Sequence, residues 1–189
     1  MARSNEPRYR AASVARLNRF GLVGAFWGVL GVIMILVNAI IRLAPVAIEA
    51  LSMPLSGLHH LGIIGSLVFF GYAEGHRGFQ KQFSPRVIAR ARYLAEHPTL
   101  LRVVLAPLFC MGFFHATRRR ILTSWLVTIA IVGLVITVRM ASQPWRGIVD
   151  LGVVVGLAWG AIAIVLFGGL AMAGRSMPVS ADIPTASMA

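Results

Sequence analysis

Four polar residues end two long apolar stretches of this sequence, and their types could support chemistry. Glu74, His76 and Arg77 follow one apolar stretch, and His115 ends another. One carboxylate and two neutral imidazoles could hold a divalent metal ion. A carboxylate beside histidines could instead relay protons or bind a ligand near neutral pH. In a third interpretation the four residues only cap helix ends and pair with nearby arginines. The sequence leaves these interpretations open.

A second histidine pair, His59 and His60, lies near the start of the same apolar stretch as Glu74. A helix rises about 21 Å from His60 to Glu74, whereas bonds to a metal are only about 2 Å long. The two ends therefore cannot share one ion. One histidine could serve as an axial haem ligand, but nothing in the sequence identifies a second contact, so any cofactor stays unknown.

Motifs that would identify an enzyme are missing. The sequence contains no Walker loop, no HExxH and no G-x-S-x-G. Its single cysteine, Cys110, excludes an intrachain disulfide and a cysteine zinc cage.

The elements that must position these residues are membrane helices. Of the 189 residues 58% are hydrophobic and 13% charged, with a mean hydropathy of +0.79. This leaves too little polar material to cover a soluble domain. About 20 apolar residues span a membrane as a helix. The sequence predicts an all-α bundle with four spans, over residues 20–41, 55–73, 121–138 and 148–172.

Residues 103–117 form a shorter apolar stretch with Pro107 inside and Arg118, Arg119 and Arg120 after it. As a helix it reaches about 22 Å, less than the ~30 Å hydrocarbon core. A full crossing would also place the three arginines outside, against the positive-inside rule. We therefore expect a re-entrant or half-embedded segment, and a fifth span is the alternative.

The same rule predicts a multi-pass protein of a bacterial cytoplasmic membrane, with both termini cytoplasmic. Residues 1–19 form a basic tail, 20–175 the transmembrane bundle and 176–189 a disordered tail. Residues 85–97 suggest a basic amphipathic helix on the inner leaflet, or one packed on the bundle's own inner end. The net charge of +12 favours anionic lipid headgroups over nucleic acid as partners.

Small residues recur at helical spacing in the first and last spans. They are Gly21, Gly24, Gly28 and Gly31, and then Gly152, Gly156 and Gly160. Such stripes allow close helix packing. We expect the stripes to pack inside the chain, where the two spans could pair with each other, and a homodimer face is the alternative. Asn38, the lone polar residue of the first span, is typical of a helix-to-helix hydrogen bond.

The outer loop carries a further charged group. Arg146 lies one helical turn before Asp150, and Arg139 ends the preceding span. We interpret the three as a structural latch.

Residues 105–120 (LAPLFCMGFFHATRRR), 144–150 (PWRGIVD) and 74–86 resemble a small group of uncharacterised bacterial polytopic inner-membrane proteins. The resemblance implies a membrane location and no particular activity. We expect a non-enzymatic accessory or assembly component that binds lipid, a partner membrane protein or a second copy. The alternatives are a small transporter or proton-binding bundle and a metal- or haem-binding membrane enzyme.

Overall fold

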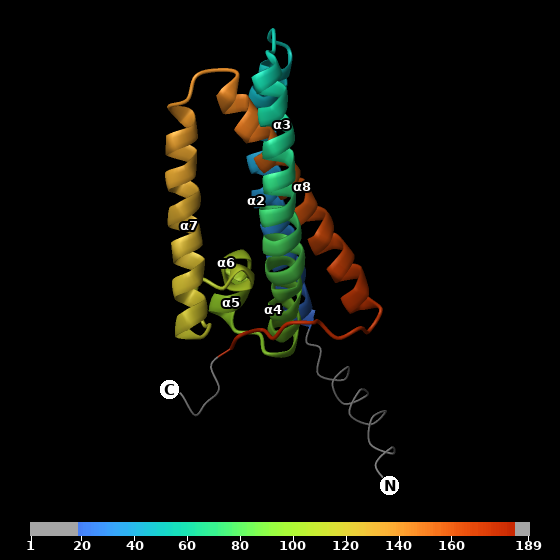
Figure 1. Ribbon diagram of the computed structural model, residues 1–189. Coiled ribbons are helices and arrows are strands. Elements are labelled where there is room, and N and C mark those ends of the chain that lie inside the picture. The colour runs from blue at the N-terminus through green and yellow to red at the C-terminus, as the bar shows by residue number, and fades with distance from the viewer. Residues whose placement is uncertain (1–18, 184–189) are drawn as a thin grey trace.

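A computed structural model describes residues 19–183, and every regular element within that range is helical (Figure 1). The elements are α2 (Arg19–Leu51), α3 (Gly57–Phe70), the π-helix η1 (Gly71–Phe83), α4 (Ser84–Glu96), α5 (Leu100–Val104), α6 (Ala106–Met111), α7 (Arg118–Arg139) and α8 (Trp145–Met172). Most of the predicted basic tail, residues 1–18, and the last six residues lie outside the described part.

Three helices, α2, α7 and α8, are long and apolar enough to cross a membrane. They include three of the four predicted spans, and the first of them continues ten residues beyond residue 41, to Leu51. The remaining predicted span, residues 55–73, falls on the 14-residue α3 and the first turn of η1. The helices α3, η1 and α4 follow one another without a break over residues 57–96. Residues 19–183 are thus all-helical in their regular structure, with three candidate membrane-spanning helices.

The short segment between α4 and α7 folds back on itself. Thr99 caps α5, its side chain accepting a hydrogen bond from the Arg102 backbone N–H at 3.4 Å. Gly112 ends α6 with a φ of +87°, a conformation that glycine adopts at little cost. Figure 1 shows α5 and α6 at the end of the bundle where α4 finishes and α7 begins.

The glycines of α2 make room for this segment. A Cβ on Gly21 would overlap the Ala95 carbonyl of α4, and one on Gly31 would overlap Pro107 of α6. Between them Gly24 faces Val103, and a Cβ on Gly28 would lie 2.8 Å from Cys110 Sγ. The stripe packs within the chain, as expected.

The glycines of α8 face a different neighbour. Gly152 packs against Ser66 and Phe70 of the α3–η1 helix, and Gly160 packs against Phe79. The two stripes therefore pack within the chain but do not face each other. Helices α2 and α8 do pack together, but the close approaches at the stripes are to other elements.

Helix α4 does not lie flat as a free amphipathic helix. It continues along the axis of α3 and η1 (Figure 1) and packs on α2, α6 and α8. Val87, Ile88 and Leu94 belong to the main buried cluster. Of the alternative interpretation, the packing of this helix on the bundle itself is confirmed, because α4 buries more than one side in protein.

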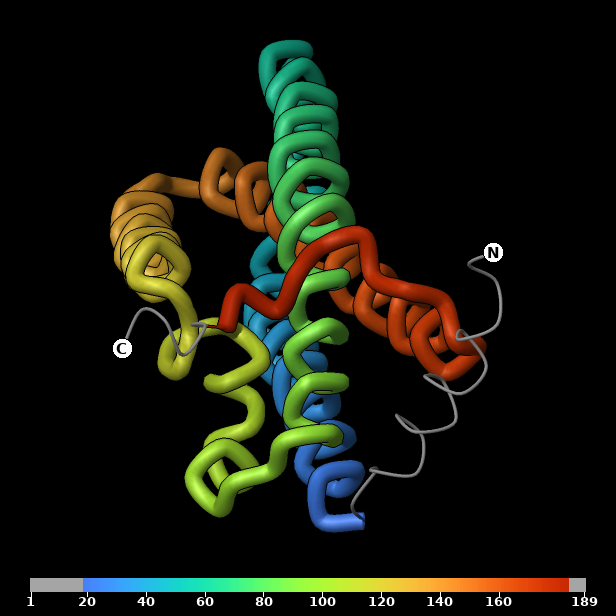
Figure 2. Tube along the Cα trace, turned by 90° about the horizontal axis from the view of Figure 1, so that it is seen from below, coloured from blue at the N-terminus to red at the C-terminus, as the bar shows by residue number. Residues whose placement is uncertain are grey.

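Residues 176–183 make specific contacts, so the predicted disorder is wrong for this part of the tail. Asp182 forms an ion pair with Arg86 at 2.9 Å, and its carbonyl accepts a hydrogen bond from the Thr117 N–H at 2.9 Å. Figure 2 shows the segment crossing one end of the bundle, from α8 towards the start of α7. The segment closes that end of the fold.

Candidate functional site

The π-helix η1 determines what faces α8. Phe70, Glu74 and Phe79 lie opposite Gly152, Gly156 and Gly160. With 3.6 residues per turn, Phe79 would point away from Phe70 after nine residues. Hydrogen bonds that span five residues wind the chain more loosely; the Ser84 N–H, for example, bonds the Phe79 carbonyl. The π winding keeps these side chains on the face that meets α8.

Glu74 lies where this face meets Gly156. A Cβ on Gly156 would be 2.9 Å from Glu74 Oε2, so the missing side chain leaves room for the carboxylate. Glu74 is half-buried and has no hydrogen bond or ion pair to any residue in the range 19–183. Arg77 is exposed, and the predicted counter-charge contact from it does not form.

His76 belongs to a small polar network beside Glu74. Its Nδ1 lies 3.2 Å from Gln80 Oε1. The same oxygen accepts a hydrogen bond from Trp159 Nε1 of α8 at 3.0 Å. This network joins η1 to α8 and gives His76 a structural partner.

His115 lies among arginines. Arg102 Nε donates to His115 Nδ1 at 3.2 Å, and Arg90 Nη2 donates to the His115 carbonyl at 3.2 Å. Partial desolvation, with the charges of Arg102 and Arg90, holds the pKa of the exposed His115 below its ordinary value. The backbone of His115 is left-handed, with a φ of +47°, which is uncommon for a residue other than glycine.

His76 and His115 thus have separate partners, and Glu74 has no hydrogen-bond or ion-pair partner among residues 19–183. The part of the chain that the structure describes contains no group of three His, Cys, Asp or Glu side chains able to hold a metal ion. The predicted three-residue metal constellation is not assembled, because His115 turns to the arginines of α4 and α5.

The other histidine pair caps a helix. The Ser56 N–H donates to His59 Nδ1 at 3.1 Å, and His60 Nδ1 lies 2.9 Å from the Ser56 carbonyl. The two rings satisfy groups at the first turn of α3. This gives both histidines a structural role at the end opposite to His115.

Arg90 is the largest polar group that sequence reasoning missed. Its side chain is fully buried, and its guanidinium donates to the carbonyls of Phe109 at 2.6 Å, Phe114 at 2.9 Å and Ala181 at 2.8 Å. The guanidinium carbon also lies 4.2 Å from the centre of the Phe109 ring. Burial lowers the pKa of Arg90 to about 10, so the group stays charged at neutral pH.

The sequence did contain a signal for Arg90. It follows Val87 by three residues and precedes Leu94 by four, so helical spacing places it on their apolar side. An arginine on the buried side of an amphipathic helix needs acceptors, and α6, the α6–α7 loop and the C-terminal segment supply them.

The predicted latch is present at the other end. Arg146 Nε lies 3.8 Å from Asp150 Oδ2, and Asp150 is buried. Arg139 is near enough to act on Asp150 electrostatically. Gln143 adds hydrogen bonds to the Val46 carbonyl and from the Gly147 N–H. The Gln143 hydrogen bond to Val46 joins the start of α8 to α2, and the Arg146–Asp150 pair lies within α8 itself.

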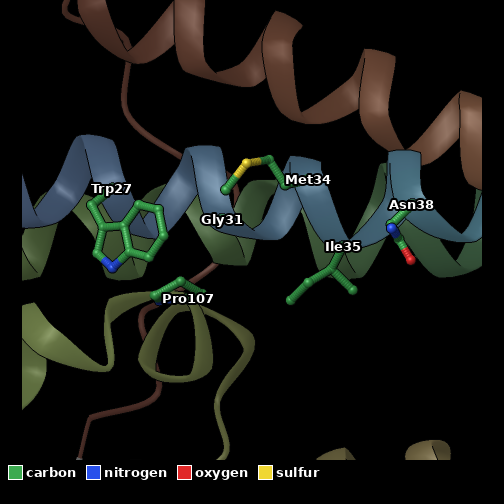
Figure 3. A pocket seen from close by; sticks show the side chains of 6 residues that line it. All are labelled: Trp27, Gly31, Met34, Ile35, Asn38 and Pro107. Carbon is green, nitrogen blue, oxygen red and sulfur yellow. The ribbon is translucent and has the colours of Figure 1, made fainter.

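A groove of about 400 Å³ opens beside α2 (Figure 3). Its lining comes from two helices only: Trp27, Gly31, Met34, Ile35 and Asn38 of α2, and Pro107 of α6. Asn38 does not form the expected helix-to-helix hydrogen bond with any residue in 19–183. It is the only polar side chain of the lining.

Helix α7 stands apart from the other long helices in both views (Figures 1 and 2). Of its 22 residues only Ser124 is buried. Ser124 Oγ donates to the Met111 carbonyl at 3.2 Å, and Trp125 meets the Phe113 ring. The rest of the helix presents large apolar side chains outward, with Leu126, Ile129 and Val132 each more than half exposed.

Comparison of the chain with protein-family models, with curated proteins and with solved structures finds no match.

Proposed function

We propose that the chain crosses the bacterial cytoplasmic membrane four times, by α2, α3 with η1, α7 and α8. The segment α5–α6 is half-embedded, and both termini are cytoplasmic. The end where α4 finishes and α7 begins carries the arginine cluster Arg118 to Arg120 as well as Arg86 and Arg92. This concentration of positive charge supports a cytoplasmic position under the positive-inside rule.

Cysteine labelling tests this topology. In a Cys110→Ala background, cysteines at Ser52 and Ser142 react with a membrane-impermeant thiol reagent added outside, and a cysteine at Thr117 does not. Labelling at Thr117 from outside would mean that α5–α6 crosses fully, so that the protein has five spans.

We further propose that the protein is a non-enzymatic accessory or assembly component that binds another membrane component along α7. The observation that supports this is the nearly complete exposure of α7. Its apolar side chains are solvated by lipid when the protein is alone. Because lipid and protein are similarly apolar, a partner helix gains contact there through shape and packing. Most of the polar groups described above have structural partners; among residues 19–183 Glu74, Arg77 and Asn38 do not.

Purification in a mild detergent tests the binding function. We expect the protein to co-purify with a partner membrane protein or a defined lipid. Leucine-to-alanine changes at Leu126 and Leu134 reduce the amount of partner or lipid recovered. A matched change at Leu170 of α8, 38% exposed as is Leu134, leaves recovery unchanged. A monodisperse protein without partner or specific lipid contradicts the proposal.

A second function, a proton- or ligand-binding bundle, is favoured by one observation. Glu74 faces α8 at Gly156 with no counter-charge among residues 19–183. A carboxyl at membrane depth without a counter-charge is costly when ionised and is often functional. Under this alternative Glu74→Gln abolishes activity in genetic complementation while the protein level stays normal. A proportional fall of activity and protein level would make Glu74 structural only.

A further inference from the structure

The groove beside α2 has a chemical gradient along its length. Trp27, Met34 and Ile35 line it with apolar surface, and Asn38 adds one amide beyond them. Figure 3 shows Ile35 and Asn38 directed towards the same open side, beyond Pro107. The groove is therefore apolar near α6 and polar towards the end of α2.

Arg42 extends this gradient. It follows Asn38 by four residues, so it lies one helical turn farther along the same face of α2. Its side chain is exposed and has no hydrogen bond or ion pair to any residue between 19 and 183. A cation thus stands at the end of a groove whose other members are apolar or amide.

We propose that this groove holds an acyl chain of an anionic phospholipid whose phosphate binds Arg42. The inference goes beyond the proposed function, because the groove lies on α2 and α6 rather than on α7. The acyl chain covers Trp27, Met34 and Ile35, and the Asn38 amide meets the ester region. The groove, about 400 Å³ in volume, is open along one side, so an acyl chain can enter it from the surrounding lipid.

Charge distinguishes this occupant from a second copy of the chain. A parallel two-fold pair built on this face would bring Arg42 of one copy near Arg42 of the other, in the same leaflet. Like charges facing each other oppose such a contact. An anionic headgroup satisfies Arg42, and the arginine attracts it by charge and hydrogen bonding.

The test is native mass spectrometry of the full chain titrated with phosphatidylglycerol or with phosphatidylcholine of the same acyl chains. The unchanged protein retains phosphatidylglycerol preferentially. Arg42→Gln weakens phosphatidylglycerol binding about fivefold and removes the preference, whereas Arg42→Lys keeps most of it. Ile35→Trp fills the groove and reduces the binding of both lipids.

Val37→Trp is the matched control, because Val37 is also partly exposed on α2 but does not line the groove. It binds both lipids as the unchanged protein does. The proposal is overturned if Arg42→Gln keeps the preference, if Ile35→Trp binds as Val37→Trp does, or if the chain appears as a lipid-free dimer. None of these changes lies on α7, so recovery of a partner through Leu126 and Leu134 tests the proposed function separately.

Discussion

The end of the bundle around Arg90 and the helix α7 differ in how far their side chains are buried. Around Arg90, carbonyls from α6, from the loop after α6 and from the C-terminal segment all meet one guanidinium. In α7 a single residue is buried. The difference teaches that an apolar sequence alone does not predict packing. Close packing in this chain accompanies small residues and buried donors, and the one glycine within α7, Gly133, faces open space.

The largest expected effect is at Arg90. Arg90→Met leaves at least three buried carbonyls without their donor, and we expect a loss of about 4 kcal/mol in the free energy of unfolding. Arg92→Met is the control, because Arg92 is half-exposed and its ion pair with Glu96 is long, at 3.7 Å. We expect this change to lower the free energy of unfolding by less than about 1 kcal/mol. Thermal unfolding in detergent measures both, and equal losses would show that the Arg90 contacts are not a stabilising centre.

A matched pair of isoleucines sharpens the comparison. Ile164 of α8 is fully buried, whereas Ile129 of α7 is 63% exposed. Ile164→Ala removes packed methyl groups, at a cost of about 3 kcal/mol. Ile129→Ala costs less than about 0.5 kcal/mol in the purified chain. If Ile129→Ala were as destabilising, α7 would pack on the bundle more closely than the structure indicates.

A tightly packed glycine of α8 and an exposed glycine of α7 extend this comparison of packing to the backbone. A Cβ on Gly147 would overlap Ala50 and approach the Val46 carbonyl at 2.6 Å, while Gly133 has nothing within 4 Å. Gly147→Ala should cost about 2 kcal/mol through this overpacking, and Gly133→Ala should be neutral or slightly stabilising. A neutral result at Gly147 would mean that the ends of α2 and α8 are not held closely.

The smallest effect concerns pH. The pKa of His115 is lower in the folded chain than its ordinary value of 6.5, so the folded state binds the proton less well than the unfolded state. Stability therefore falls as the pH drops below about 6.5. His115→Asn, which tolerates a left-handed backbone, flattens this part of the curve. Unfolding at pH 7.5 and pH 5 measures it, and an unchanged slope in the variant contradicts the assignment.

The sequence predicted the class of fold because hydropathy and length are local properties. Three of the four predicted spans correspond to long apolar helices, and the short segment containing Pro107 forms the two short helices α5 and α6. The ion pair of Arg146 with Asp150 was also readable, because one helical turn separates the two residues.

The remaining features depend on contacts between distant segments. The π winding of residues 71–83 cannot be read from apolar spacing, so the face presented by Glu74 was not predictable. The sequence grouped His115 with Glu74 only because both were expected on the same side of the membrane. In the structure the His115 carbonyl accepts a hydrogen bond from Arg90, so His115 lies among the arginines instead. The order of residues 176–183 follows from contacts to Arg86 and Thr117, which composition does not reveal.

The most direct test of the central claim is site-specific photo-crosslinking from α7 in the native membrane. A photoreactive amino acid is placed at Leu126, Ile129 or Val132, all exposed, and at the buried Ile164 as the control. The account predicts crosslinks from α7 to a partner membrane protein or to a specific lipid, and only within the chain from Ile164. It would be contradicted if all three α7 positions crosslinked within the chain itself, to α2 or α6.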